Sequence, residues 1–118
     1  MNQDYRLYEA KQAVLEMDRS GYVPRQPGKA RVVGRDGRAV MQMGALGLRQ
    51  GGFISEHDYL IASKLANVLA GGDVPAGTVV TEQHLLDLER EAFLSLLGET
   101  KTQQRMQHML AKGKPLRN

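Results

Sequence analysis

The chain has 118 residues, of which 42% are apolar and 25% charged, and its formal net charge at pH 7 is +3. It contains no cysteine, which excludes a disulfide framework, a thiolate zinc site and a cysteine nucleophile. No run approaches the ~20 apolar residues of a membrane span, and the first residues lack the apolar core of a secretory signal. We therefore expect a single helical domain over residues 1–118, located in the cytoplasm.

The first predicted element is a helix over residues 4–18. An apolar residue recurs at the spacing of one helix face: Leu7, Ala10, Val14 and Met17. Asn2 or Asp4 is the expected N-cap, and Gly21 ends the helix.

A long loop over residues 21–37 follows the first helix. Pro24 and Pro27 bias the residues before them toward extended backbone, whereas the flanking bases and Gly34 argue against a strand at Val32 and Val33. The loop and the residue after it carry five bases, namely Arg25, Lys29, Arg31, Arg35 and Arg38. A loop this long in a compact domain is typically functional, or it is held by a partner.

The second predicted helix, residues 38–50, is rich in glycine. Gly44, Gly47 and Gly51 share one face, so this strip is expected to let another backbone approach closely. The glycines do not form a nucleotide fingerprint, because no strand precedes them and no G-x-G-x-x-G occurs.

The third predicted helix begins at Ser55, where Asp58 at the third helical position completes an acidic variant of the capping box. It ends at the glycine pair Gly71 and Gly72.

The fourth helix begins at Thr81 and ends at Gly98. Its apolar residues form two rows, which indicates a helix that contacts neighbours on two sides. The rows are Leu85, Leu88, Ala92 and Leu96, and Leu86, Phe93 and Leu97.

The fifth helix is expected to start at Thr100, whose pairing with Gln103 has the capping-box form. It closes at Gly113 and Pro115. The predicted fold class is all-α, a small bundle of about five helices with a long basic loop after the first.

No catalytic constellation emerges from the polar residues, and we predict neither a catalytic residue nor a metal ligand. Glu56, His57 and Asp58 are consecutive on a helix and point about 100° apart, so helix capping is their expected role. His84 is placed to contact Asp87 one turn later.

Charge is distributed unevenly along the chain. Residues 19–50 carry a net +6, residues 73–99 carry −5, and residues 100–118 carry +5. The basic stretches either bind a phosphate-bearing partner or are neutralised within the folded protein. Nucleic acid is not the expected partner, because no helix presents bases on one face and no aromatics interleave with them. A stand-alone helical module for an anionic partner is the alternative function.

Two long segments resemble the carboxyl end of large bacterial fatty-acid β-oxidation proteins. They are GGFISEHDYLIASKLANVLAGGD, residues 51–73, and LLDLEREAFLSLLGETKTQQRMQHMLAKGKPLRN, residues 85–118. The first fifty residues are similar too, in the AKQAVLEM and GYVP runs and the glycine-rich helix. Proteins of this family join a 3-hydroxyacyl-CoA dehydrogenase to an enoyl-CoA hydratase of the crotonase type.

The resemblance implies that the chain is the C-terminal part of a much larger enzyme. The family's catalytic glutamates, oxyanion-hole amides and dehydrogenase glycine fingerprint would lie upstream, so NAD and acyl-CoA are expected for the parent and no cofactor for this chain. The upstream domains of the same polypeptide are the expected partners, within a homo-oligomer.

In crotonases the last helix ends near the CoA adenine and its phosphate. The matching positions here are Met109, Lys112 and Lys114, where crotonases usually have Phe in place of Met109. The resemblance therefore implies a CoA contact at these three residues; otherwise they form a solvated basic tail.

Overall fold

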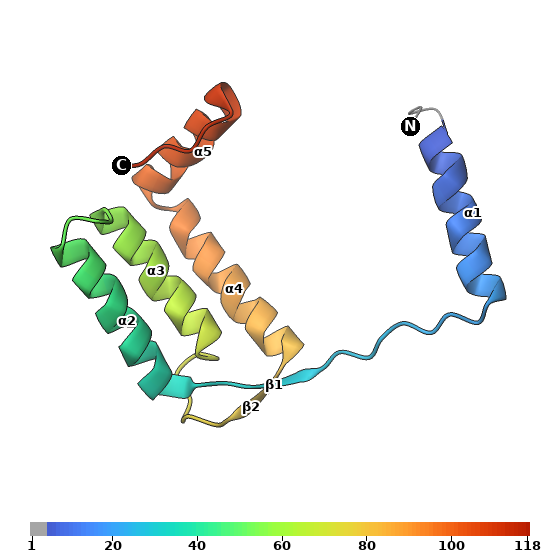
Figure 1. The fold of residues 1–118 in the computed structure, drawn as a ribbon, viewed down its shortest axis with the longest axis horizontal. Coiled ribbons are helices and arrows are strands. Elements are labelled where there is room, and N and C mark those ends of the chain that lie inside the picture. The colour runs from blue at the N-terminus through green and yellow to red at the C-terminus, as the bar shows by residue number, and fades with distance from the viewer. Residues whose placement is uncertain (1–4) are drawn as a thin grey trace.

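The computed structural model describes residues 5–118, and within them it contains five helices and one two-stranded sheet (Figure 1). In chain order these are α1 (Arg6–Arg19), β1 (Lys29–Arg31), α2 (Gly34–Gln50), α3 (Glu56–Leu69), β2 (Val79–Thr81), α4 (Glu82–Leu97) and α5 (Thr100–Lys112). The mainly helical class and the five helices are confirmed. The expected caps of the first helix, Asn2 and Asp4, lie outside the described residues.

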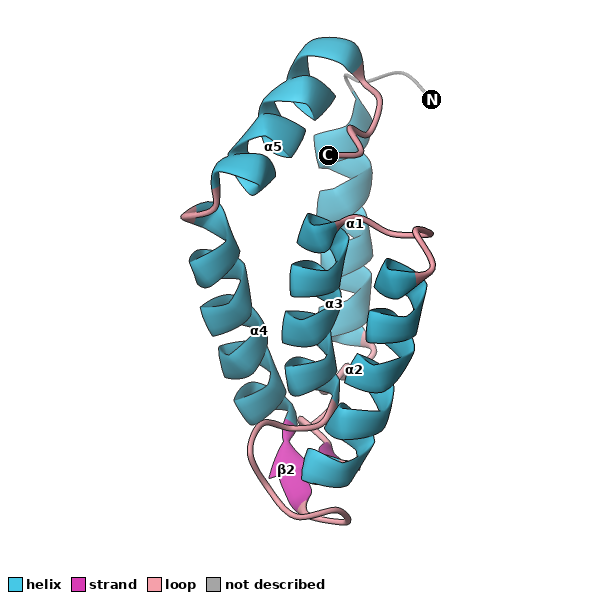
Figure 2. Ribbon diagram, turned by 90° about the vertical axis from the view of Figure 1, so that its left-hand side faces the viewer, coloured by secondary structure: helices cyan, strands magenta, loops and turns pink. Residues whose placement is uncertain are grey.

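Helices α2, α3 and α4 lie side by side with α3 in the middle, and α5 lies at the end of this layer opposite the sheet (Figure 2). The best-buried apolar residues gather at the sheet end of the layer: Val32, Ala66, Ala70 and Val80. Small side chains at Ala66 and Ala70 let the C-terminal half of α3 pack closely against its surroundings.

The two-stranded sheet was not expected from the sequence, and the prediction of a loop without a strand over residues 21–37 is wrong. β1 pairs antiparallel with β2 so that Ala30 lies opposite Val80, and the pairing continues with the Val32 amide donating to Thr78 O at 2.9 Å. The flanking bases do not oppose the strand, because Arg31 is exposed and donates to Gly77 O at 3.0 Å.

Helix α2 begins at Gly34 and not near Arg38, as the sequence suggested. Gly34 has φ +64° and is buried, with its amide donating to Ala70 O at 3.1 Å. The next amide, that of Arg35, donates to Val74 O at 2.9 Å. Contacts with the end of α3 and the segment after it therefore determine where α2 starts. The residues around Gly34 in the sequence do not reveal these distant contacts.

The predicted caps of α3 and α4 are confirmed. Ser55 Oγ accepts from the Asp58 amide, and the Asp58 carboxylate accepts from the Ser55 amide, both at 3.1 Å. Thr81 Oγ1 accepts from the His84 amide at 3.1 Å.

The predicted cap of α5 is wrong, because its N-cap is Glu99 and Thr100 is already helical. The Gln103 side chain does not close a capping box. Its Nε2 donates to Leu97 O at 2.9 Å, which satisfies a carbonyl at the end of α4.

The glycine face of α2 is open within the described part of the chain. A β-carbon built at Gly44 or Gly47 would meet no atom within 4 Å. The close approach of another backbone, which the glycine spacing predicted, is thus not supplied by residues 5–118.

Helix α1 stands apart from the other four helices (Figure 1) and has no buried residue. The radius of gyration is 20.0 Å, against about 13.5 Å for a compact chain of this length. None of the five described helices is long and apolar enough to cross a membrane.

Candidate functional site

The C-terminal end of α5 carries the three residues that the resemblance singled out. Met109 and Lys112 are one turn apart on the helix, and Lys114 follows directly after Gly113, which ends α5 with φ +66°. Lys112 and Lys114 are both exposed. The two ammonium groups therefore belong to one helix end, where the carbonyl-rich C-terminus favours positive charge.

An apolar hollow of about 360 Å³ lies on α5 and includes Met109 but neither of the two lysines. It is lined by Arg105, Met106, Met109 and Leu110, and Leu110 is 87% exposed. An apolar surface suits a flat ring, and ammonium groups suit an anionic group of a ligand. The helical spacing of Met106 and Leu110 was visible in the sequence, but it gave no sign that both side chains stay exposed.

Arg105 anchors α5 and the chain after it. Its Nη1 donates to Asp58 Oδ1 at 2.8 Å, its Nε to Asn118 Oδ1 at 2.7 Å, and its Nη2 to the Asn118 carbonyl oxygen at 3.2 Å. The segment after Gly113 therefore folds back along α5, and the helix is held on the N-terminus of α3. Sequence reasoning missed this arginine, because its partners lie far away along the chain.

Asp58 is the acidic partner of this anchor. Its carboxylate accepts from the Ser55 backbone amide and from the Arg105 guanidinium, and these two contacts, the amide first, hold its pKa below the usual value. The charged form of Asp58 is thus favoured in the folded protein.

The three histidines do not converge within the described structure. His57 does not cap α3 as expected: its side chain is 4% exposed, and its Nε2 lies 2.9 Å from Thr102 Oγ1 of α5. His84 Nε2 lies 2.9 Å from Gly71 O, and the predicted contact with Asp87 is absent, since Asp87 accepts from Gln83. No group of three His, Asp or Glu side chains in residues 5–118 could hold a metal ion.

The basic loop is largely occupied by contacts within the chain. Arg35 and Arg38 each approach Asp73 Oδ1 at 3.5 Å, and Arg38 also donates to Asn67 Oδ1 at 2.9 Å. Arg31 donates to Gly77 O. Two of the five bases, Arg35 and Arg38, therefore share one acidic partner, Asp73.

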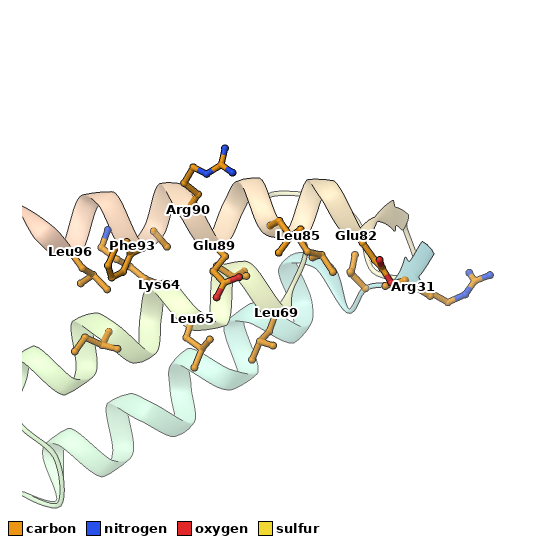
Figure 3. A pocket seen from close by; sticks show the side chains of 16 residues that line it. Arg31, Lys64, Leu65, Leu69, Glu82, Leu85, Glu89, Arg90, Phe93 and Leu96 are labelled. Carbon is orange, nitrogen blue, oxygen red and sulfur yellow. The ribbon is translucent and has the colours of Figure 1, made fainter. Parts of the chain in front are cut away.

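A groove of about 1030 Å³ lies between α3 and α4 (Figure 3). Leu85, Phe93 and Leu96 extend from α4 toward it, whereas Arg90 points away. The second apolar row of α4, predicted to contact a neighbour, is left half-exposed at Leu86 and Phe93.

Comparison with known proteins shows similarity to a longer protein over the whole chain. No family model and no solved structure matches. The chain is 55% identical over all 118 residues to a "Probable 3-hydroxyacyl-CoA dehydrogenase" of Bacillus subtilis (strain 168), and it spans 15% of the length of that protein. The chain is therefore similar, from end to end, to a C-terminal part of a protein named as a dehydrogenase of 3-hydroxyacyl-CoA.

Proposed function

We propose that this chain is the C-terminal helical part of a longer cytoplasmic 3-hydroxyacyl-CoA dehydrogenase that also carries a crotonase-type enoyl-CoA hydratase and acts in fatty-acid β-oxidation. The observation that supports the proposal is the 55% identity over the entire chain to part of one much longer protein. The role of the chain is packing and assembly of the parent, together with a contact to CoA.

Catalysis in this proposal belongs to the upstream domains. The chain has no glycine fingerprint for a dinucleotide, so NAD would be held upstream. Among the histidines and acids, His57 joins α3 to α5, and Asp58 caps α3 and binds Arg105.

The CoA contact rests on the chemistry of the α5 end. CoA presents a flat adenine ring and phosphates, and α5 presents a hollow that Met109 lines, with Lys112 one helical turn after Met109 and Lys114 just after the helix. Ammonium groups bind phosphate oxygens through charge-assisted hydrogen bonds. This proposal assigns Met109 to the ring and the two lysines to phosphate.

The size of the native polypeptide tests the placement in a larger enzyme. An immunoblot of lysate from cells that make the protein, probed with antibody against the purified chain, is expected to show a band several times heavier than 13.1 kDa. The purified chain run beside it is the size control. A sole band at the size of the purified chain would contradict the proposal.

Substitution of Lys112→Ala together with Lys114→Ala tests the CoA contact in the full-length enzyme. We expect acyl-CoA affinity to fall roughly 3- to 10-fold, because two exposed charge contacts are each worth up to ~1 kcal/mol. Titration of the enzyme with CoA gives the dissociation constant.

The matched control is Lys11→Ala with Lys101→Ala, which removes the same charge at exposed positions away from the end of α5. An equal loss in both double variants would indicate a general charge effect. Unchanged affinity in the Lys112 and Lys114 variant would exclude a phosphate contact there.

A further inference from the structure

Helix α1 is joined to the rest of the described structure neither by polar contacts nor by burial. Within residues 5–118, every hydrogen bond of residues 6–22 stays inside that segment, and no ion pair involves it. The helix has no buried residue, and Leu7 and Val14 are 86% and 63% exposed. A single helix of 14 residues is marginally stable in water, so its apolar stripe needs another surface to cover it. The stripe consists of Leu7, Ala10, Val14 and Met17.

The compact part of the chain begins at Gly28, and we call residues 28–118 the helical body. The Gly28 carbonyl oxygen accepts from the Glu82 amide at 3.2 Å, and β1 pairs with β2 directly after it. Residues 21–27 are all exposed and lie in no helix or strand. Pro24 and Pro27 stiffen this connector, because a proline fixes its own φ and favours extended backbone at the residue before it. The connector therefore carries α1 away from the helical body (Figure 1).

The position of α1 in the chain favours one cover for the stripe over the others. In the parent of the proposed function, on which this inference rests, the preceding polypeptide joins residue 1, five residues before α1 begins at Arg6. A surface attached through so short a segment is present at an effective concentration of about 1 mM. A second copy at micromolar concentration is roughly 1000-fold more dilute. The preceding polypeptide is also large, since the chain spans only 15% of the length of its relative.

We infer that α1 packs as the last helix of the preceding unit of the parent, meaning the part before residue 1, with its stripe on an apolar surface of that unit. The partner surface needs no net charge, because α1 carries three bases and three acids. Residues 20–27 are then the linker between the preceding unit and the helical body. The boundary between the two units lies inside the chain, which differs from the single domain over residues 1–118 that the sequence suggested.

Hydrogen–deuterium exchange of the 118-residue chain and of the full-length parent tests this inference. Peptides from α1 report on the stripe, and peptides from α3 report on the helical body. In the 118-residue chain, α1 is expected to exchange about as fast as an unfolded peptide, whereas α3 is protected. In the parent, α1 is expected to exchange roughly 100-fold more slowly, because burial of its apolar side chains stabilises the helix.

Two double variants of the parent identify the face of α1 that makes the contact. Leu7→Glu with Val14→Glu changes the stripe and is expected to remove most of the protection of α1. Gln12→Glu with Arg19→Gln is the matched control, because it lowers the net charge by the same amount at the same spacing on the opposite face. The control is expected to keep the protection. The comparison of the two wild-type proteins needs no variant, so it remains decisive if a variant of the parent does not fold.

Removal of residues 1–20 tests whether the helical body is independent of α1. The shortened chain is expected to keep the urea midpoint of the 118-residue chain, because α1 contributes no buried residue. A clearly lower midpoint would overturn the inference, since it would show that α1 stabilises the helical body.

Three exchange results would also overturn the inference. Protection of α1 in the 118-residue chain at every concentration would assign the stripe to its own helical body, and protection that grows with concentration would assign it to a second copy. Equal exchange of α1 in the parent and in the 118-residue chain would show that the preceding unit leaves it uncovered. The immunoblot distinguishes these failures from failure of the proposed function. A sole band at 13.1 kDa rejects the parent itself, whereas a heavy band together with an unprotected α1 overturns this inference alone.

Discussion

Replacement of Gly34 by alanine is expected to destabilise the helical body by about 2–5 kcal/mol. The backbone of Gly34 has φ +64°, a conformation that costs an L-residue roughly 1–2 kcal/mol. A β-carbon there would also lie 2.5 Å from Pro75 C and 2.6 Å from Val74 O, and closer still to Ala76 N. These are backbone atoms, so relief requires displacement of the segment after α3, and overpacking of this kind costs about 1–3 kcal/mol more. Urea unfolding followed by circular dichroism measures the loss.

Gly44→Ala is the matched control for that substitution. Gly44 lies inside the same helix, its φ is ordinary, and an added β-carbon meets open space. Alanine is the better helix former, so this variant is expected to gain up to about 1 kcal/mol. If the two glycine variants changed stability in the same direction by similar amounts, the packing of residues 74–76 over the start of α2 would be incorrect.

Arg105→Ala is expected to lower the free energy of unfolding by roughly 2 kcal/mol. The substitution removes hydrogen bonds to Asp58 and Asn118 and leaves a partly buried carboxylate without its cationic partner. Chemical unfolding at pH 7 measures the loss. Arg90→Ala is the control, because the exposed Arg90 side chain points away from the α3–α4 groove.

The effect of Arg105→Ala should depend on pH in a defined direction. The pKa of Asp58 is lowered in the folded protein, so the carboxylate adds stability above its unfolded pKa of about 3.9, and this stability is lost as pH falls through the folded pKa. The stability difference between wild type and variant should therefore be full at pH 7 and shrink below about pH 4. A difference that stays constant down to pH 3 would exclude Asp58 as the partner that matters.

Elements determined by neighbouring residues were predictable from the sequence. Ser55 and Asp58 satisfy each other's backbone within one turn, and Thr81 caps the amide three residues later, so both helix starts follow from local chemistry. The wrong cap at Thr100 shows the limit of this reasoning. The Gln103 side chain donates to the Leu97 carbonyl instead of closing a capping box, and the sequence motif does not reveal that competing partner.

Features that depend on distant partners were not predictable. The start of α2 at Gly34 depends on the carbonyls of Ala70 and Val74, and β1 depends on β2 some fifty residues later. Arg105 looked like one base among several, because Asp58 lies 47 residues away. Periodicity detects a helix face, but it does not tell which other segment will lie against it.

The candidate residues at the end of α5 have a different origin. Met109, Lys112 and Lys114 came from resemblance to a family and not from any pattern of their own, and the structure adds a hollow that Met109 lines. The second apolar row of α4 was expected to contact a neighbour, but Leu86 and Phe93 remain more than half exposed. The structure shows that this neighbour is missing from the described chain in its present arrangement.

The small sheet has a consequence for how the chain acquires its structure. The main helix contacts join helices that follow one another along the chain, α2 with α3, α3 with α4 and α4 with α5, whereas β1 and β2 bring together Ala30 and Val80 from the two sides of the α2–α3 pair. Contacts between near neighbours form quickly, while closing a long loop carries an additional entropic cost. We therefore expect the helical layer to form first during folding and the strand pair to form last. On unfolding, the strand pair, and with it the attachment of the segment that leads to α1, is expected to open first.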